Sequence, residues 1–154
     1  MTAVPARADF ADGLAAYDAG DYEAAYQAWL PLARSGQGDA QAAVADLYLS
    51  GLVARSVGPN AQHRNEAAAV WWYQQAARCG HAVAQLNLGE LRERGVGARR
   101  DRVAGYVWLA LAARTGNGWA DANRRRLASV LTAPQLAAAS RRVEAWSPAT
   151  DCPR

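Results

Sequence analysis

The chain has 154 residues, which is enough for one domain with a substantial core and too few for two ordinary domains. Half of it is apolar, but its mean hydropathy is slightly negative and no apolar run reaches the length of a membrane-spanning helix, so we expect no integral membrane association. The net charge is only +3, and basic runs interleaved with aromatic residues are missing, which argues against a nucleic-acid partner.

The charges are unevenly placed along the chain. All seventeen basic residues are arginine; residues 1–50 hold seven acids and two arginines, whereas residues 51–154 hold seven acids and fifteen arginines. Such an asymmetry can guide an acidic partner to one end. Charges on solvated helix faces explain it more simply, and we favour that interpretation.

Residues 1–8 form a leader whose origin the sequence leaves open. They lack the apolar stretch of a signal peptide, yet Ala6-Arg7-Ala8 before Asp9 has the small-x-small form of a signal-peptidase site. If the leader is the remnant of a signal peptide, the mature protein begins near Asp9 and is periplasmic or secreted. If its alanines are coincidental, the protein is cytoplasmic.

The next segment, residues 9–35, predicts a first pair of helices. It contains the sequence FADGLAAYDAGDYEAAYQAWLPLARS, which is rich in alanine, the best helix former. Tyr17 and Gly20 lie at spacings that recur further along the chain. The segment therefore begins the series of helix pairs that follows.

A repeat runs through residues 36–115. Counted from Gly36 and again from Gly80, alanine falls at +4, glutamine at +5 and glycine at +15. Counted backwards from Gly80 and from Gly116, tryptophan falls at −8 and two alanines at −4 and −3. The glycines are 44 and then 36 residues apart, and we assign the eight extra residues to the loop LVARSVGPNAQHR.

This spacing predicts paired antiparallel helices. The marked positions recur at i, i+4 and i+8, which is one face of an α-helix, and each glycine suits a left-handed C-terminal cap. Trp72 and Trp108 hold equivalent positions, so we interpret both as packing residues rather than as parts of a ligand site. The small residues at +9, Ala45 and Gly89, would let a neighbouring helix approach closely.

The stretch WWYQQAARCGHAVAQLNLGELRERGVG resembles the Sel1-like repeat, a relative of the tetratricopeptide repeat. The resemblance covers two units, residues 36–79 and 80–115, and implies an all-α fold, a short right-handed solenoid of about seven to eight stacked helices. It also implies a non-catalytic scaffold for protein–protein or protein–peptide interaction, in the manner of bacterial adaptor or regulatory proteins. We therefore expect a protein or peptide partner, no cofactor and a monomer.

Residues 116–146 predict a degenerate repeat that ends in a capping helix. Ala120 keeps its repeat position, but Arg124 and Arg125 replace the small and apolar residues at +8 and +9. Thr132-Ala-Pro-Gln135 then has the form of a capping box with proline in the first turn. We expect it to open a last helix, about 133–146, that covers the open end of the stack, with residues 147–154 as a tail.

The stretch GVGARRDR, residues 95–102, has two interpretations. Gly-x-Gly followed by arginines resembles half of a phosphate-binding loop, but such a loop follows a strand and here the preceding element is a helix. Gly95 is the counterpart of Gly51 at +15, and Asp101 stands where an N-cap belongs. We therefore predict a turn inside a helix pair, with its arginines exposed.

Histidines and cysteines offer no metal site in the sequence. His81 stands where Gln37 and Asn117 stand in the other units, so we expect it to begin a helix, and His63 in the long loop has no ligands at zinc spacing. Cys79 and Cys152 lack metal-ligand spacing as well. In an oxidising compartment they could join the tail to an earlier helix by a disulfide; in the cytosol they would stay reduced.

Glu90 and Glu93 are the best acid–base pair in the sequence, but acids three apart on an exposed helix are ordinary. No Gly-x-Ser-x-Gly elbow or partnered histidine offers a nucleophile, so we expect no catalytic residue and no enzymatic activity. The alternative function is a small cell-envelope hydrolase, or a peptidoglycan- or β-lactam-binding protein, on the same scaffold.

The resemblance places the binding surface on the first helix of each pair, which lines the concave side in relatives of this repeat. Residues at +7 and +10 then point inward, and Trp119, at +3, is the expected aromatic anchor. The predicted partner-binding residues are Asp46, Asn87, Glu90, Trp119, Asn123 and Arg126, with Ala43 completing the +7 positions.

Overall fold

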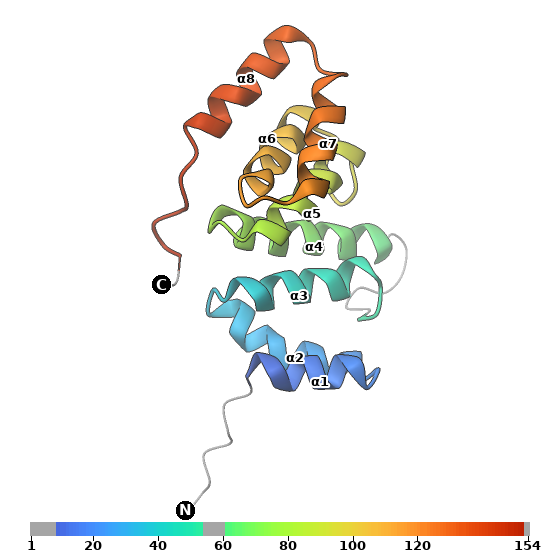
Figure 1. Ribbon diagram of the computed structural model, residues 1–154. Helices are drawn as coiled ribbons and strands as arrows, with labels where there is room; N and C mark the ends of the chain where they lie inside the picture. Colours follow the sequence, from blue (N-terminus) through green and yellow to red (C-terminus); the bar gives the residue numbers. More distant parts are fainter. Residues whose placement is uncertain (1–8, 54–60, 153–154) are drawn as a thin grey trace, which may run out of the picture.

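The computed structural model describes residues 9–53 and 61–152, and within these ranges it contains eight helices and no strand (Figure 1). The helices are α1 (Phe10–Asp18), α2 (Tyr22–Arg34), α3 (Gly38–Leu49), α4 (Ala61–Arg78), α5 (Ala82–Arg94), α6 (Arg102–Ala113), α7 (Gly118–Ala128) and α8 (Ala133–Glu144). The leader, and the hypothesis of a processing site within it, lie outside the described residues.

The helices form a stack in chain order, in which each helix from α1 to α6 packs on the one that follows it (Figure 1). The core is correspondingly divided into three consecutive clusters, which centre on α2 with α3, on α3 with α4 and α5, and on α6 with its C-terminal neighbours. Such division is expected of a solenoid, because each repeat contacts only its neighbours. The predicted all-α solenoid is confirmed.

The repeat glycines end their helices as the sequence predicts. Gly51 and Gly95, which follow the first helices of their pairs, have φ angles of 70° and 74°. Gly36, Gly80 and Gly116, which follow the second helices, have φ angles of 92°, 91° and 84°. This left-handed region is open to glycine at little cost, so the spacing of the glycines reports the lengths of the helices directly.

The α5 and α6 helices cross closely at two glycines. A Cβ added to Gly89 would lie 2.8 Å from Leu109 Cγ and 3.1 Å from the carbonyl oxygen of Gly105. A Cβ added to Gly105 would in turn lie 3.0 Å from the carbonyl oxygen of Gly89. The close approach predicted for the +9 position is therefore present at Gly89.

The eight extra residues of the first repeat do not all lie in a loop, and in this respect the sequence-based expectation is wrong. The α4 helix already begins at Ala61 and has 18 residues, whereas its counterpart α6 has 12. The backbone of His63 is therefore helical. In the first turns of α4, Gln62 and Glu66, four residues apart, join their side chains by a hydrogen bond of 3.1 Å, which favours the helix.

The GVGARRDR stretch is a turn between α5 and α6, as predicted. Asp101 caps α6 by accepting a hydrogen bond from the backbone N–H of Ala104 at 2.9 Å. Gly97 has a φ of 67° and lies so close to α4 that a Cβ would overlap the carbonyl of Glu66. Gly95 and Gly97 are thus both needed for the backbone geometry of this turn.

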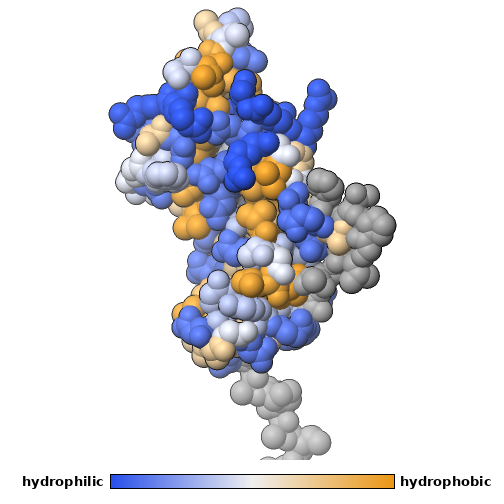
Figure 2. All heavy atoms as spheres, turned by 90° about the vertical axis from the view of Figure 1, so that its right-hand side faces the viewer, coloured by the Kyte–Doolittle hydropathy of each residue, from blue (hydrophilic) through white to orange (hydrophobic). Residues whose placement is uncertain are grey.

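On the face shown in Figure 2, strongly hydrophilic residues gather over the upper part of the stack.

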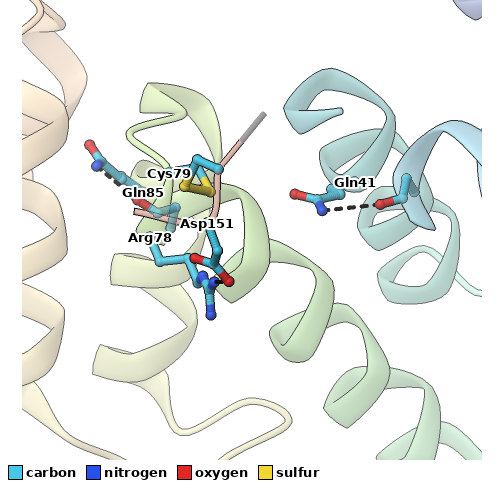
Figure 3. The surroundings of a disulfide bond; sticks show 8 residues. Gln41, Arg78, Cys79, Gln85 and Asp151 are labelled. Atoms are coloured by element: carbon cyan, nitrogen blue, oxygen red, sulfur yellow. Dashed lines mark hydrogen bonds and ion pairs between the residues drawn. A yellow bond between two sulfur atoms is a disulfide. The ribbon is translucent and has the colours of Figure 1, made fainter. Parts of the chain in front are cut away.

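The last helix and the segment after it turn back along the stack. Thr132 and Gln135 form the predicted capping box at the start of α8. The helix packs chiefly on α6 and leaves much of α7 uncovered, and α7 buries only two of its residues. Residues 145–152, which we call the strap, continue from α8 towards α4 (Figure 1). A disulfide joins Cys152 to Cys79, whose Cα atoms are 5.5 Å apart (Figure 3).

Candidate interaction face

Three helices of the stack present side chains at the same repeat positions. They are α3, α5 and α7, which begin after Gln37, His81 and Asn117, the three residues that the sequence aligns. Because the helices start in register, residues at equal distances from these caps lie on equivalent faces. We call the residues at these positions the first-helix face: Asp46, Asn87, Glu90, Trp119, Asn123 and Arg126.

At the junction of α5 and α7, Glu90 connects the two helices. Its Oε1 atom accepts hydrogen bonds from the indole N–H of Trp119 at 2.7 Å and from the amide of Asn123 at 3.1 Å. The indole ring of Trp119 nevertheless remains accessible, since 66% of the residue is exposed. Three of the predicted residues are therefore in direct contact, and the aromatic one faces solvent.

Arg126 extends this network towards Glu93. Its guanidinium donates two hydrogen bonds to the Glu93 carboxylate, at 2.7 and 2.6 Å, and a longer one to Asn123 at 3.3 Å. This bidentate contact with Arg126 is the main reason that the pKa of Glu93 lies below its usual value. Glu93 was not among the predicted binding residues, although its place one helical turn after Glu90 could have indicated it.

At the junction of α3 and α5, the two helices meet over Tyr73 of α4. The hydroxyl of this fully buried tyrosine donates to the Asp46 carboxylate and is also hydrogen-bonded by the side chain of Asn87. Burial raises the pKa of Asp46, although the bond from Tyr73 opposes the change; burial and the adjacent carboxylate raise the pKa of Tyr73. The sequence analysis assigned no role to Tyr73.

His81 links the same two helices at their N-termini. Its Nδ1 atom accepts a hydrogen bond from the backbone N–H of Ala84, which caps α5 and confirms the predicted helix-start position. Because Nδ1 is the acceptor, Nε2 carries the proton of the neutral ring and donates to Asp39 at 2.8 Å. His81 is therefore a structural link between successive repeats.

These contacts occupy the residues that could have supported chemistry. Glu90 and Glu93 accept the hydrogen bonds of Trp119, Asn123 and Arg126. The described residues contain no group of three or more side chains suited to hold a metal ion. The arrangement is instead that of an ordered surface with an exposed aromatic ring and fixed polar groups, which suits recognition.

A model of the Sel1 repeat matches residues 38–81 and 82–117, which is more than half of the sequence. The chain belongs to the Sel1 repeat family. The two matched units are shifted by two residues from the two repeats found from the glycine spacing, and Sel1 repeats generally serve as scaffolds for protein–protein interaction.

Two solved structures with Sel1-type folds are similar to this chain. One is c5321, a protective antigen present in uropathogenic Escherichia coli strains that displays an SLR fold; it is 26% identical with a TM-score of 0.75 over 86% of this chain. This chain covers only 27% of that antigen. The other is a Sel1 repeat protein from Oxalobacter formigenes, 28% identical with a TM-score of 0.58 over 77% of this chain and 98% of its own. None of the curated proteins matches the sequence.

Some features of the site region were not predicted from the sequence. Gln41 and Gln85, at +5 of the two Sel1 repeats, each donate to the carbonyl of an alanine in the preceding helix, Ala33 and Ala77, at 3.1 Å. The repeated glutamine was visible in the sequence, but its hydrogen bond was not.

In the part of the chain that the structure describes, no helix is both long and apolar enough to cross a membrane.

Proposed function

We propose that this Sel1 repeat protein is a non-catalytic adaptor that binds a protein or peptide partner on its first-helix face. The observation that carries the proposal is the continuous set of hydrogen bonds from Glu90 through Asn123 to Arg126, beside an exposed tryptophan. Ordering the polar side chains before a partner arrives reduces the entropy lost on binding. Trp119 is then the anchor of the interface.

The surroundings of Trp119 support this assignment. Val83, at the same +3 position of the preceding repeat, is 52% exposed, so two apolar side chains on neighbouring first helices are open to a partner. Asp39 occupies the +3 position of the first Sel1 repeat and is also exposed. A partner segment that carries apolar side chains and hydrogen-bond donors would match this face.

We also propose that the protein works in an oxidising compartment. The support is the disulfide between Cys79 and Cys152, since structural disulfides persist in the periplasm and outside the cell. The hydrolase alternative has no such support, because Glu90 and Glu93 are engaged by the residues that they position.

The test is affinity capture from the native organism with the tagged full-length protein, read by mass spectrometry. We expect a partner retained by the wild type to be lost from Trp119→Ala, because truncating a central aromatic anchor typically costs about 2 kcal/mol or more of binding free energy. The matched control is Leu14→Ala, which removes an apolar side chain that is 46% exposed on α1.

Circular dichroism of both variants should match that of the wild type, since both side chains lie at the surface. A partner that binds Trp119→Ala and the wild type equally would contradict the assignment of the face. If the wild type captures no protein at all, the adaptor function itself is wrong.

A further inference from the structure

The strap lies against the C-terminal end of α4. The backbone N–H of Ala149 donates to the carbonyl of Arg78 at 2.9 Å, and Asp151 pairs with the Arg78 guanidinium (Figure 3). Trp146 packs in the cluster formed by α6 and α8 and lies over Gly80. The surface at the end of α4 is thus covered by a C-terminal segment of the chain itself.

The repeat places an equivalent position one unit earlier, at the end of α2. A shift of 44 residues relates Ala77–Gly80 to Ala33–Gly36 and Gln85 to Gln41, and a shift of 36 residues relates α6 to α4. A pocket of about 320 Å³ lies at this position. Its lining includes Arg34, Gln41, Trp71, Trp72 and Arg78, together with Asp151 of the strap. We call it the open groove.

The open groove lacks the cover that its counterpart has. Trp71 is 53% exposed, whereas Val107, the equivalent residue of α6, is 4% exposed beneath α8 and the strap. The amide oxygen of Gln41 is buried without a hydrogen-bond partner, and the residue as a whole is only 6% exposed. Figure 3 shows this oxygen directed away from the helix that the amide nitrogen contacts. A donor is therefore missing at the floor of the open groove.

Arg34 completes the correspondence with Arg78. Both are the last residues of second helices, and within the described chain no acid pairs with Arg34 and no donor reaches its carbonyl. Arg78, by contrast, uses its carbonyl for Ala149 and its guanidinium for Asp151. The carbonyl and guanidinium of Arg34 thus correspond to the two groups of Arg78 that hold the strap, and both are available in the open groove.

We propose that the open groove binds an extended, acidic segment of a partner protein in the way that its counterpart binds the strap. A backbone N–H of the segment donates to the Arg34 carbonyl, and a carboxylate two residues later pairs with the Arg34 guanidinium. A proline or aromatic side chain earlier in the segment packs on Trp71 and Trp72. This site is separate from the first-helix face, so it would give the scaffold a second point of attachment.

The strap itself supplies the probe. An acetylated, fluorescently labelled peptide of residues 145–152 carrying Cys152→Ser is titrated into the full-length, disulfide-bonded protein, and binding is read by fluorescence anisotropy. We expect Arg34→Gln to weaken binding about fivefold, as for loss of a partly exposed ion pair. A second peptide also carries Asp151→Asn. It should bind the wild-type protein about fivefold more weakly than the first peptide does, whereas the two peptides should bind Arg34→Gln equally well, because the ion pair is already absent there.

The controls separate this site from the others. Arg125→Gln, on α7, should bind the first peptide as the wild type does, and so should Trp119→Ala, whereas Trp71→Ala should weaken binding. Absence of binding to the wild type would overturn the proposal. Equal binding to Arg34→Gln and the wild type would also overturn it, because the peptide would then displace the strap from the end of α4. A loss confined to Trp119→Ala would overturn it as well, because the peptide would then lie on the first-helix face.

Discussion

Glu93 shows how a single residue of the first-helix face depends on another helix. Its side chain is only 12% exposed, and Arg126 of α7 is the charge that compensates its burial. The pKa of Glu93 is lowered in the folded state, so its ionised form is stabilised there. The resulting stability is fully present above the pKa of a glutamate in the unfolded chain and is lost as the pH falls through the lower pKa of the folded state.

Arg126→Gln should therefore lower the free energy of unfolding by about 1 kcal/mol at pH 7, which is the upper end for a partly exposed pair. The difference from the wild type should shrink as the pH falls below about 4.5, because Glu93 then binds a proton in the unfolded chain first and in the folded protein only at lower pH. Urea unfolding between pH 7 and pH 3 measures it. The control is Arg142→Gln on α8, which removes an exposed arginine and should have little effect; an Arg126→Gln deficit that persists unchanged at pH 3 would contradict the pairing.

The crossing of α5 and α6 is the element-scale feature that the repeat depends on most. The two helices touch through Gly89 and Gly105, so that Leu109 reaches the backbone of α5. A side chain at either glycine would push the helices apart, and the cores on both sides of the crossing would lose contact. The small residue at +9 is thus required by packing between helices and not by backbone conformation.

Gly89→Ala should lower the free energy of unfolding by about 1–3 kcal/mol because the new methyl group overfills the crossing. Gly118→Ala, at the start of α7, is the matched control. A Cβ there meets no atom within 4 Å, and the same exchange should be neutral or stabilise by up to about 1 kcal/mol. Urea midpoints of the two variants give the comparison. Equal stability of Gly89→Ala and the wild type would show that the helices do not cross this closely.

At the scale of the whole molecule, the strap ties the C-terminal end of the stack back to its middle. Contacts in a solenoid are otherwise confined to neighbouring repeats, so the terminal helices are held from one side only. The disulfide links residues 73 positions apart and fixes the C-terminal segment to the end of α4. We expect the strap to stabilise the C-terminal repeats as one unit with the middle of the stack.

Cys152→Ser should lower the free energy of unfolding by about 2–4 kcal/mol, because the unfolded chain regains the freedom of a long loop. Dithiothreitol should destabilise the wild type by a similar amount. The variant carrying both Cys79→Ser and Cys152→Ser serves as the control and should not respond to the reductant. Unfolding curves of the wild type that coincide with and without reductant would show that the cysteines are not bonded in solution.

Much of the fold could be predicted from the sequence because the repeat encodes it locally. Glycines at fixed spacing mark the helix ends, and His81 and Asn117 begin α5 and α7 where the alignment places them. The first-helix face follows from the same register, since positions 7 and 10 of each helix share one side. Its role in binding a partner remains a prediction.

What the sequence by itself determined is therefore the repeating part of the fold: the helix pairs, their order and the glycines that end them. The tertiary structure alone decided where the unrepeated C-terminal segment lies. The α8 helix packs on α6, and the strap covers the end of α4 but leaves the open groove at the end of α2 uncovered. The physical reason is that these contacts join residues far apart in the chain, at positions with no periodic pattern. Whether two such residues meet depends on the geometry of the assembled stack, as the distance between Cys79 and Cys152 does.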